Sequence, residues 1–554
     1  MLNHIGIGLL LMAWMQPLHF LPWMSWHSEV LAFIAVLFMS AGVLAQIFNT
    51  RNPALTVPRA VFPLLLLFAI AVVQVGSERI SFVGDGVVIS IYLALCLFGL
   101  FVGAHTRSLY SLALALLVGA ICSVLIELVQ AFDVWESVTW ISRPLGVRRP
   151  GGNLGQPNQL ATLLLMGVAS LTYLFESRRI SAMFAGMLTV LLLCGLAITE
   201  SRTGVLSLLV MGTWWLISRK SLALRTSFAV VIFAICGFAI LLLAWPPFIG
   251  FVRAGGWVEE AIVARVDGSV GLRAVVWPQL LAAALQRPWF GWGLREVSEA
   301  HNAVLDAYSV GEPFSYAHNI VLDSAIGIGL PLTVLLFTVV TVWGVLRVRA
   351  VRSLLPWYCI AMALPFATHS MLEYPFAYAY FLLPVMLAIG VLERELAIGQ
   401  VFRVSRWVAI ALLSITTAVM AWTVWDYVRV EEDFRIVRFE ARNVGKTPAD
   451  YGRPNIVLLT QMSAMLEASR IVPERDMAPE RIELSRKAAM RFPWTATQNR
   501  YALSLALNGN PDEARRQIKV MRAMHGEGTH RGIMRNWQEL ADAKYPELNE
   551  FIEP

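Results

Sequence analysis

Apolar stretches of about 20 residues recur along most of this chain, and each is long enough to cross a bilayer as a helix. A segment inside hydrocarbon has to pair its own backbone groups, so an α-helix is the expected structure of each stretch. The first stretch lacks a basic leader and a small-residue cleavage site, and we expect it to be a retained helix. We therefore predict an all-α polytopic membrane protein with about 13 transmembrane helices. The stretches lie roughly at 5–24, 29–48, 58–76, 84–103, 109–132, 159–175, 180–198, 203–218, 226–245, 319–346, 354–370, 376–392 and 405–425.

The composition agrees with this class of protein. Hydrophobic residues make up 57% of the 554 residues and charged residues only 15%, whereas about a quarter of a soluble globular protein is charged. The net charge of +6 comes largely from basic residues in short loops, and no basic groove with interleaved aromatic residues is visible. We therefore expect no nucleic-acid partner.

Basic residues are distributed unevenly between the two alternating sets of short loops, and basic loops stay in the cytoplasm. We therefore expect the N-terminus in the cytoplasm. The long loop at about 246–318 and the C-terminus would then lie on the opposite, external side of the membrane. The opposite set of short loops offers little beyond Arg79 and Arg202. The basic set contains Arg51, Arg59, Arg107, Arg178, Arg179, Arg219, Lys220, Arg225, Arg347, Arg349, Arg352, Arg394, Arg403 and Arg406.

A second domain is indicated by the rise in charge density after Trp425. We predict a transmembrane domain at 1–425 and a soluble helical domain at 426–554. Apolar residues at helical spacing in the second domain, with breaks at Pro493 and Asn508–Pro511, resemble a tetratricopeptide hairpin. A generic helical cap is the alternative, and a partner-binding role is a hypothesis. The residues that carry this resemblance are Tyr501, Ala502, Leu505, Gly509 and Ala514.

Motifs for metal, nucleotide or disulfide chemistry are absent from the sequence. All five cysteines fall in apolar stretches, where they are expected to pack as small hydrophobic residues. The chain has no CxxC pair, no zinc-ligand spacing and no glycine-rich nucleotide loop. We therefore expect no cofactor and no metal ligands.

Polar residues instead gather at the predicted external ends of helices. In "GGNLGQPNQLA", Asn153, Gln156 and Asn158 offer amide groups where the chain enters a helix, and a helix N-terminus can bind an anion. The alternative is ordinary capping by Asn158, with Pro157 as the first helical residue.

Arginines near the same ends suit an anionic ligand, because guanidinium groups stay charged and bind phosphate oxygens in pairs. Arg202 lies in "ESRTG", where a local pair with Glu200 is the alternative. Arg273 is four residues before Trp277, on the same face of a predicted helix, so the indole could stack on the guanidinium. We favour phosphate binding for these two arginines and structural pairing for Arg265, Arg287 and Arg295.

A histidine stands where the long loop meets the next apolar stretch. In "YAHNIVLDSAIGIGLP", His318 and Asn319 precede that stretch, and histidine can act as a base near neutral pH. His301 in "EAHNA" has the same following residue but lies within the loop. A lone histidine is more often structural, so topology alone leaves the role of His318 open.

Five strings occur in an order that resembles the O-antigen ligase superfamily, specifically its bacterial protein O-oligosaccharyltransferase branch. They are "GNLGQPNQLATLL", "ESRTG", the Arg273/Trp277 spacing followed by "RPWFGWG", "AHNIVLDSAIGIGLP" and "HSMLEYPFAYAYF". The similarity covers about residues 140–390. It implies a metal-independent glycosyltransferase that moves an oligosaccharide from an undecaprenyl-diphosphate carrier to Ser or Thr hydroxyls of periplasmic proteins such as pilins.

The resemblance also implies residue roles. The essential histidine of the family falls on His318 and its anion-binding arginines on Arg202 and Arg273. Further important positions fall on Gln156 and Tyr374. We expect other substrate contacts from Asn153, Asn158, Asn319, Arg265 and Glu373.

The chemistry these roles require is simple, because a lipid diphosphate is already a good leaving group. The protein has to align it, neutralise its charge and deprotonate the incoming hydroxyl. A ligase acting on lipid A core, or a glycan polymerase, would use the same donor and base with a sugar hydroxyl as acceptor. A lipid-linked glycan transporter is a more distant alternative, since such proteins usually show internal repeats and polar sites in mid-membrane. An envelope scaffold would not explain the external arginines.

Overall fold

The computed structural model describes residues 1–48, 55–133, 139–142, 149–254, 269–397, 401–442 and 444–552. By contacts the chain divides into two compact units. The first unit comprises Met1–Leu65, Ile91–Arg265 and Val339–Met420, and the second comprises Leu66–Ser90, Val266–Thr338 and Ala421–Pro554.

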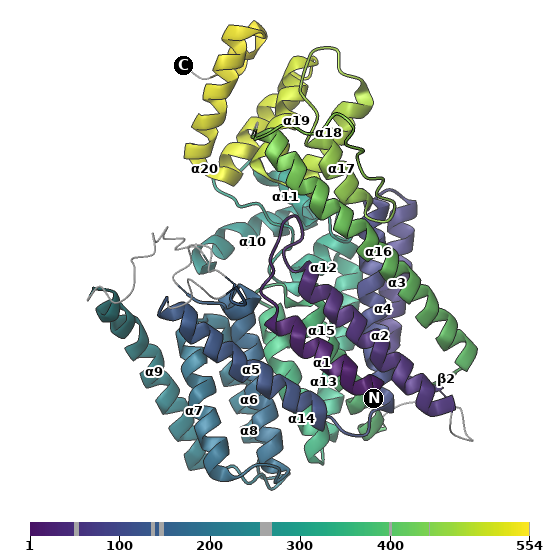
Figure 1. The fold of residues 1–554 in the computed structure, drawn as a ribbon, viewed down its shortest axis with the longest axis vertical. Helices are drawn as coiled ribbons and strands as arrows, with labels where there is room; N and C mark the ends of the chain where they lie inside the picture. Colours follow the sequence, from purple (N-terminus) through teal and green to yellow (C-terminus); the bar gives the residue numbers. More distant parts are fainter. Residues whose placement is uncertain are drawn as a thin grey trace. The chain divides into compact units, whose positions relative to one another are not determined.

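The first unit is built mostly from helices, many of which pack side by side (Figure 1). Its one described strand pair is β1 with β2, antiparallel, with Leu55 opposite Val404. The elements wholly within this unit are α1 Leu2–Met15, α2 Trp26–Phe48, β1 Leu55–Pro58, η1 Arg59–Val61, α5 Tyr110–Ala131, η2 Gly152–Leu154, α6 Pro157–Glu176, α7 Ala182–Ile198, α8 Arg202–Ser218, α9 Phe228–Ala254, α14 Leu354–Ser370, η3 Pro375–Ala377, α15 Ala379–Leu396 and β2 Val401–Val404.

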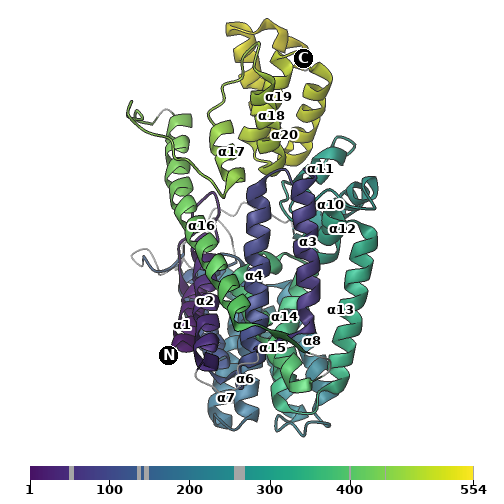
Figure 2. The ribbon, with the colours of Figure 1, turned by 90° about the vertical axis from the view of Figure 1, so that its right-hand side faces the viewer.

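The second unit joins the long loop to the C-terminal segment (Figure 2). Its own elements are α10 Ser269–Gln286, α11 Val297–Leu305, α12 Ile320–Ile328, α17 Thr460–Ala468, α18 Pro479–Arg491, α19 Thr495–Leu507, α20 Pro511–Ala543 and η4 Pro546–Phe551. Four long helices run from one unit into the other, and they are α3 Phe62–Gly76, α4 Val83–His105, α13 Leu330–Ala350 and α16 Arg406–Ala441. The predicted domain boundary after residue 425 falls within α16 and remains a prediction.

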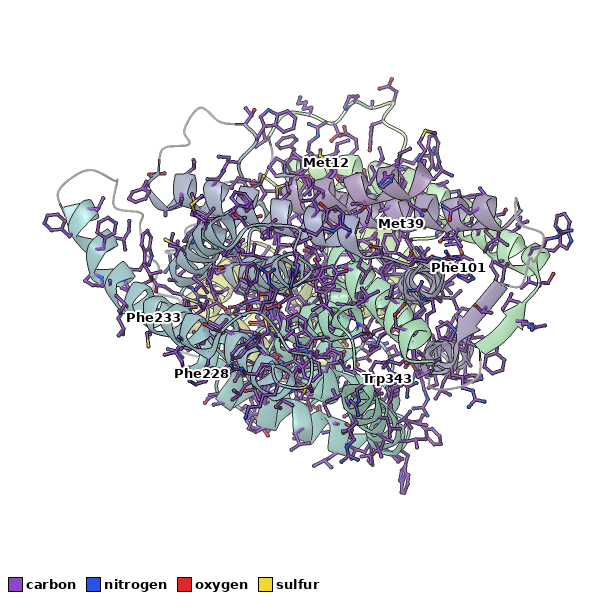
Figure 3. The ribbon with its side chains drawn as sticks, turned by 90° about the horizontal axis from the view of Figure 1, so that it is seen from below. Met12, Met39, Phe101, Phe228, Phe233 and Trp343 are labelled. Carbon is purple, nitrogen blue, oxygen red and sulfur yellow. The ribbon has the colours of Figure 1, made fainter. Side chains whose placement is uncertain are left out.

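Membrane character is confirmed by the helices. Eight of the described helices are long and apolar enough to cross a membrane, and they lie at Trp26–Ile47, Arg59–Gly76, Val83–His105, Tyr110–Ala131, Pro157–Glu176, Phe228–Val252, Leu330–Ala350 and Arg406–Ala441. Every predicted window contains helix, but several of these helices are shorter, so the number 13 remains a prediction. On α9, Phe228 and Phe233 (Figure 3) are largely exposed, as expected of a surface that faces lipid.

Three predicted spans have the wrong limits. The first helix ends at Met15, not near residue 24, because Pro17 disfavours helix at the residue before it. The helix α9 continues through Pro246 and Pro247 to Ala254, so the long loop starts later than predicted. The predicted span 319–346 is two helices, since Gly329 adopts a φ of 83° and separates α12 from α13.

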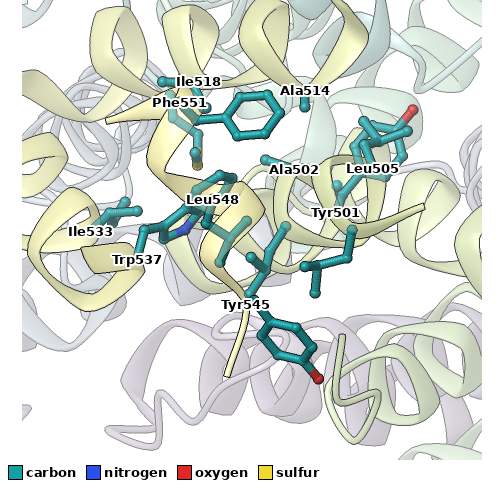
Figure 4. Packing of buried hydrophobic residues seen from close by; sticks show 14 of the residues in the cluster. Tyr501, Ala502, Leu505, Ala514, Ile518, Ile533, Trp537, Tyr545, Leu548 and Phe551 are labelled. Carbon is teal, nitrogen blue, oxygen red and sulfur yellow. The ribbon is translucent and has the colours of Figure 1, made fainter. Parts of the chain in front are cut away.

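The C-terminal segment has a hydrophobic core of its own (Figure 4). Tyr501, Ala502, Leu505 and Ala514 are buried in it together with Trp537, so the apolar spacing found in the sequence marks the buried face. Both predicted breaks are confirmed, since α18 ends before Pro493 and the turn 508–510 separates α19 from α20. The helices α18, α19 and α20 pack in succession, while the likeness to a tetratricopeptide repeat remains a prediction.

Candidate functional site

The first unit contains a buried polar cluster centred on Asn158. The side-chain amide of Asn158 donates to Oε1 of Glu373 (3.2 Å), and its carbonyl accepts a hydrogen bond from the hydroxyl of Ser201 (2.7 Å). Ser201 is the N-cap of α8 and accepts from the N–H of Gly204. Asn158 therefore links the start of α6 to the start of α8 and to the segment that follows α14.

The predicted alternative for Asn158, simple capping of its own helix, is wrong. Gln156 occupies the N-cap position and Pro157 the first helical position, as predicted for that proline. The side chain of Gln156 is partly exposed and makes no hydrogen bond with the residues that the structure describes. Gln156 is therefore available to a ligand at the N-terminus of α6.

The side chain of Asn153 is bonded to backbone groups, which gives it a structural role. Its amide donates to the carbonyls of Met15 (2.6 Å) and Trp140 (2.9 Å), and its oxygen accepts from the N–H of Ser142 (3.0 Å). Asn153 is 2% exposed. These bonds fix the end of α1 against η2 and account for Asn153 without a substrate.

Glu373 and Tyr374 follow α14, where both were predicted to contact substrate. Glu373 is buried and accepts a hydrogen bond from Asn158, so in this structure it stabilises the polar cluster. Tyr374 is partly buried, and its ring stacks on Tyr378 with the ring centroids 5.7 Å apart. Sequence reasoning missed His369, whose Nδ1 lies 2.8 Å from the hydroxyl of Thr162 on α6.

Arg202 is the first residue of α8, and its side chain is exposed. Among the described residues it has no hydrogen-bond or ion-pair partner, so the predicted alternative of a pair with Glu200 is wrong. The neighbouring Ser201 binds Asn158, which fixes the backbone that carries Arg202. A guanidinium held in this way at a helix N-terminus is suited to an anion.

In the second unit, α10 packs against the segment that carries His318. The indole N–H of Trp277 donates to the carbonyl of Ala317 (3.1 Å). Arg273 lies one turn before Trp277 on the same face of α10, and its side chain is partly exposed. The indole of Trp277 therefore holds the loop before His318. Its predicted stacking on Arg273 remains a prediction.

The backbone at His318 is unusual, because this non-glycine residue has a φ of 53°. Asn319, the next residue, is the N-cap of α12 and accepts from the N–H groups of Val321 and Leu322. Asn319 is thus a helix cap, which is a structural role beside its predicted role in substrate binding. The carboxylate of Asp323 accepts from the N–H of Ala317 (2.8 Å) and closes the turn.

The imidazole of His318 is half-buried and meets the ring of Phe314 edge-on, with the centroids 4.7 Å apart. Burial raises the pKa of the nearby Glu312 carboxyl, and His318 partly offsets that rise. His318 therefore contacts an aromatic ring and interacts electrostatically with a carboxyl group, at a point where the backbone is fixed on both sides. Phe314 and Glu312 gave no signal in the sequence.

A buried charge cluster joins the C-terminal segment to the long loop. Asp85 accepts two hydrogen bonds from Arg491 (both 2.8 Å) and pairs with Arg295 (2.9 Å). The predicted structural pairing of Arg295 is confirmed. Burial, with the charge of Asp85 nearby, raises the pKa of Glu296 to about 7.

Arg287 and Arg265 are the other two arginines for which structural pairing was predicted. Arg287 stacks on Trp292, with its guanidinium carbon 3.9 Å from the ring centroid. Arg265 lies outside the described residues. Within the described part of the chain, no group of three or more His, Cys, Asp or Glu residues is arranged to hold a metal ion.

Three family models match parts of the chain. The model described as O-antigen ligase matches residues 187–337, and the model described as protein glycosylation ligase matches residues 150–175. The model described as the C-terminal part of a virulence factor membrane-bound polymerase matches residues 357–538. The predicted resemblance to the O-antigen ligase superfamily is thereby confirmed.

Two curated relatives come from Acinetobacter baylyi (strain ATCC 33305 / BD413 / ADP1). A general O-oligosaccharyltransferase is 26% identical over 533 residues, which cover 93% of this chain and 91% of the relative. A ComP-specific O-oligosaccharyltransferase is 28% identical over 272 residues, covering 49% and 47%. Both relatives are glycosyltransferases, so the comparisons confirm the predicted enzyme class.

Proposed function

We propose that this protein is a protein O-oligosaccharyltransferase of a bacterial inner membrane. It transfers an oligosaccharide from an undecaprenyl-diphosphate carrier to Ser or Thr hydroxyls of periplasmic proteins such as pilins. The N-terminus is cytoplasmic, and the reaction takes place on the periplasmic side. The similarity of the general O-oligosaccharyltransferase over 93% of the chain supports this choice of acceptor class.

The geometric observation that carries the proposal is the hydrogen bond from Trp277 to Ala317. It brings the helix that carries Arg273 against the residue that precedes His318, within one compact unit. A base and a permanent cation near each other are what a displacement with a diphosphate leaving group requires.

In the proposed reaction, His318 accepts the proton of the acceptor hydroxyl as its oxygen attacks the anomeric carbon of the glycan. The bond between that carbon and the diphosphate oxygen breaks, and the configuration at the carbon inverts. Arg202 and Arg273 stabilise the negative charge that collects on the departing undecaprenyl diphosphate. No metal ion is required, because these guanidinium groups supply the positive charge.

The remaining residues orient the reactants. Gln156 donates its free amide to the glycan or the phosphates, and Tyr374 contributes a ring and a hydroxyl at the end of α14. Asn158 and Glu373 act mainly by holding the segment that carries Arg202, since their polar groups bind each other and Ser201.

A second function is favoured by the two family models named for a ligase and a polymerase. A ligase would deliver the glycan to lipid A core, and a polymerase would extend the glycan on its carrier. Both would use the same donor, base and arginines with a sugar hydroxyl as acceptor.

The test is an in vitro transfer assay with the purified full-length protein, an undecaprenyl-diphosphate oligosaccharide, a pilin-like protein and EDTA. We expect a glycan mass on a Ser or Thr of the acceptor protein. Transfer to lipid A core, or growth of the glycan on its carrier, with an unmodified protein would replace this proposal with the ligase or the polymerase. A dependence on added divalent metal would contradict the proposed role of the arginines.

A further inference from the structure

A polar pocket of about 830 Å³ lies in the second unit. The turn between α3 and α4 (residues 75–83), the segment 286–290 after α10 and one face of α18 line it. The pocket is distinct from the residues assigned to the transfer reaction, none of which lines it.

The elements around the pocket place it near the surface of a bilayer. The helices α3 and α4 are both long and apolar enough to span a membrane, so the turn between them is the point where the chain leaves and re-enters hydrocarbon. The N–H of Leu330, the first residue of the candidate span α13, donates to the carbonyl of Pro288 (2.7 Å). The segment 286–290 is thereby tied to the end of a third span.

Two aromatic side chains at the edge of the pocket have the placement expected at a membrane interface. Trp289 is 70% exposed and Phe290 is 67% exposed. Aromatic residues collect at the boundary between hydrocarbon and headgroups, where one side meets lipid and the other meets water. Water alone gives no reason to expose two large rings side by side.

The charged side chains that line the pocket carry one net positive charge, because Arg79, Arg287, Arg486 and Lys487 oppose Glu78, Glu299 and Glu483. Glu483 and Glu299 both bind Arg486, so this group of three keeps one negative charge. Arg287 and Lys487 make no ion pair with a carboxylate among the described residues.

Arg79 adds a third positive charge in a fixed position. Its guanidinium donates to the carbonyl of Gly291 (3.0 Å) and lies over the ring of Phe290, with 5.3 Å to the centroid. Arg287 is held in a similar way on Trp292. Guanidinium groups that are pre-oriented on aromatic rings lose little entropy when they bind a phosphate.

We propose that this pocket binds the headgroup of an anionic phospholipid. The phosphodiester contacts Arg287, Arg79 and Lys487, while the acyl chains pass beside Trp289 and Phe290 into the bilayer. A phospholipid fits better than the reacting diphosphate, because the pocket and His318 lie at opposite ends of α12. That helix has nine residues and is about 14 Å long. The inference does not depend on the proposed transfer reaction.

Native mass spectrometry of the full-length protein tests this site. The delipidated protein is titrated with phosphatidylglycerol and, separately, with phosphatidylcholine of the same acyl chains. We expect preferential retention of phosphatidylglycerol, weakened about tenfold or more in the double variant Arg287→Ala/Lys487→Ala. The matched control is Arg535→Ala, because Arg535 is an exposed arginine of α20 that does not line the pocket. Thermal unfolding identifies any variant that fails to fold, and the single variant Lys487→Ala then replaces the double one.

Equal retention of the two lipids would overturn the proposal, and so would unchanged phosphatidylglycerol binding in the double variant. Competition with farnesyl diphosphate separates the two sources of phosphate. Farnesyl diphosphate is added to the wild-type protein with phosphatidylglycerol bound, and separately to the double variant. If it displaces phosphatidylglycerol from the wild type at a lower concentration than it needs to bind the double variant, the pocket belongs to the glycan donor, and the phospholipid assignment is wrong.

Discussion

The dipeptide His-Asn occurs twice in the second unit, and its two surroundings differ in burial and backbone geometry although both imidazoles lie near the ring of Phe314. His301 lies inside α11, is 0% exposed, and donates from Nε2 to Oε1 of Gln279 (2.9 Å). His318 precedes α12, is half-buried and has a left-handed backbone. The difference shows that access and backbone geometry, rather than the local sequence, distinguish a candidate base from a packed histidine.

The asparagines of the two dipeptides follow the same division. Asn302 exchanges hydrogen bonds with Gln517 of α20 (3.2 and 3.1 Å) and so joins the loop to the C-terminal segment. Asn319 caps its own helix. One asparagine is therefore held by a distant side chain and the other by its own helix.

The largest expected effect comes from His318→Ala. Removal of a general base lowers the rate by about 10²–10⁴-fold, so glycan transfer should fall to near the detection limit. The thermal unfolding temperature should change little, since His318 is half-buried and lies outside a helix. Transfer is measured as the mass shift of the acceptor protein.

The control for this variant is His301→Gln. Alanine at position 301 would leave a cavity and an unpaired Gln279, whereas glutamine can still donate to Gln279. Transfer should stay within a few-fold of the wild type. An equal loss of transfer in both variants would show that His318 is the wrong base.

A similar contrast holds between the exposed Arg202 and Arg295, which pairs with the buried Asp85. Arg202→Ala should lower kcat by about 10²-fold with an unchanged unfolding temperature, because its exposed side chain supports only the proposed anion. Arg202→Lys should recover only part of the rate, since an ammonium group cannot bind two phosphate oxygens side by side. By contrast, Arg295→Ala should lower the unfolding temperature, because it removes a partner of the buried Asp85. If Arg202→Ala lowers stability and spares kcat, the arginine is structural.

The pH dependence of stability should also report the burial of His301. Burial lowers the pKa of His301 to about 4, below the value of about 6.5 in an unfolded chain. Between these values the unfolded state binds more protons, so the free energy of unfolding falls as the pH falls from about 6.5 to 4, by up to about 3 kcal/mol. His301→Gln should lose this part of the pH dependence, as measured by thermal unfolding at pH 7 and pH 5. The same slope in wild type and variant would assign it to other groups.

The smallest effect concerns the cap. Asn319→Ala should cost about 1 kcal/mol of stability, and Asn319→Ser should recover most of it, because serine also caps helices. Both variants should keep the KM for the donor if Asn319 acts only as a cap. A raised KM in Asn319→Ser, with unchanged stability, would support the predicted contact with substrate.

Helix positions were largely predictable because apolar length is a one-dimensional signal. Each predicted window contains a helix, and the breaks in the C-terminal segment lie where proline and glycine indicated. The limits failed where a single residue decides between continuation and a break. Gly329 interrupts one predicted span, while Pro246 and Pro247 are accommodated inside α9.

The candidate site was predictable only in its exposed, charged residues. Arg202 and Arg273 could be selected as charged residues near a membrane end, whereas His318 could be assigned a role only through the family resemblance. Their supports could not be selected, since Ser201, Ala317 and Glu312 are ordinary residues whose importance depends on tertiary contacts. Asn153 shows the opposite situation, because the sequence offers its amide as a ligand group while the fold engages that amide with backbone carbonyls.

The contact between α20 and the long loop should constrain how these two segments evolve. The N–H of Gly311 donates to the carbonyl of Ala523 (2.9 Å), and Leu305 packs on Val520, Ala523 and Met524. The stretch that leads to His318 is thus shaped by residues about two hundred positions later in the chain. Two relatives that exchange their tails alone would mismatch this contact, whereas an exchange of loop and tail together would preserve it. The loop and the tail should therefore evolve together. Chimeras of two relatives should exchange both segments at once.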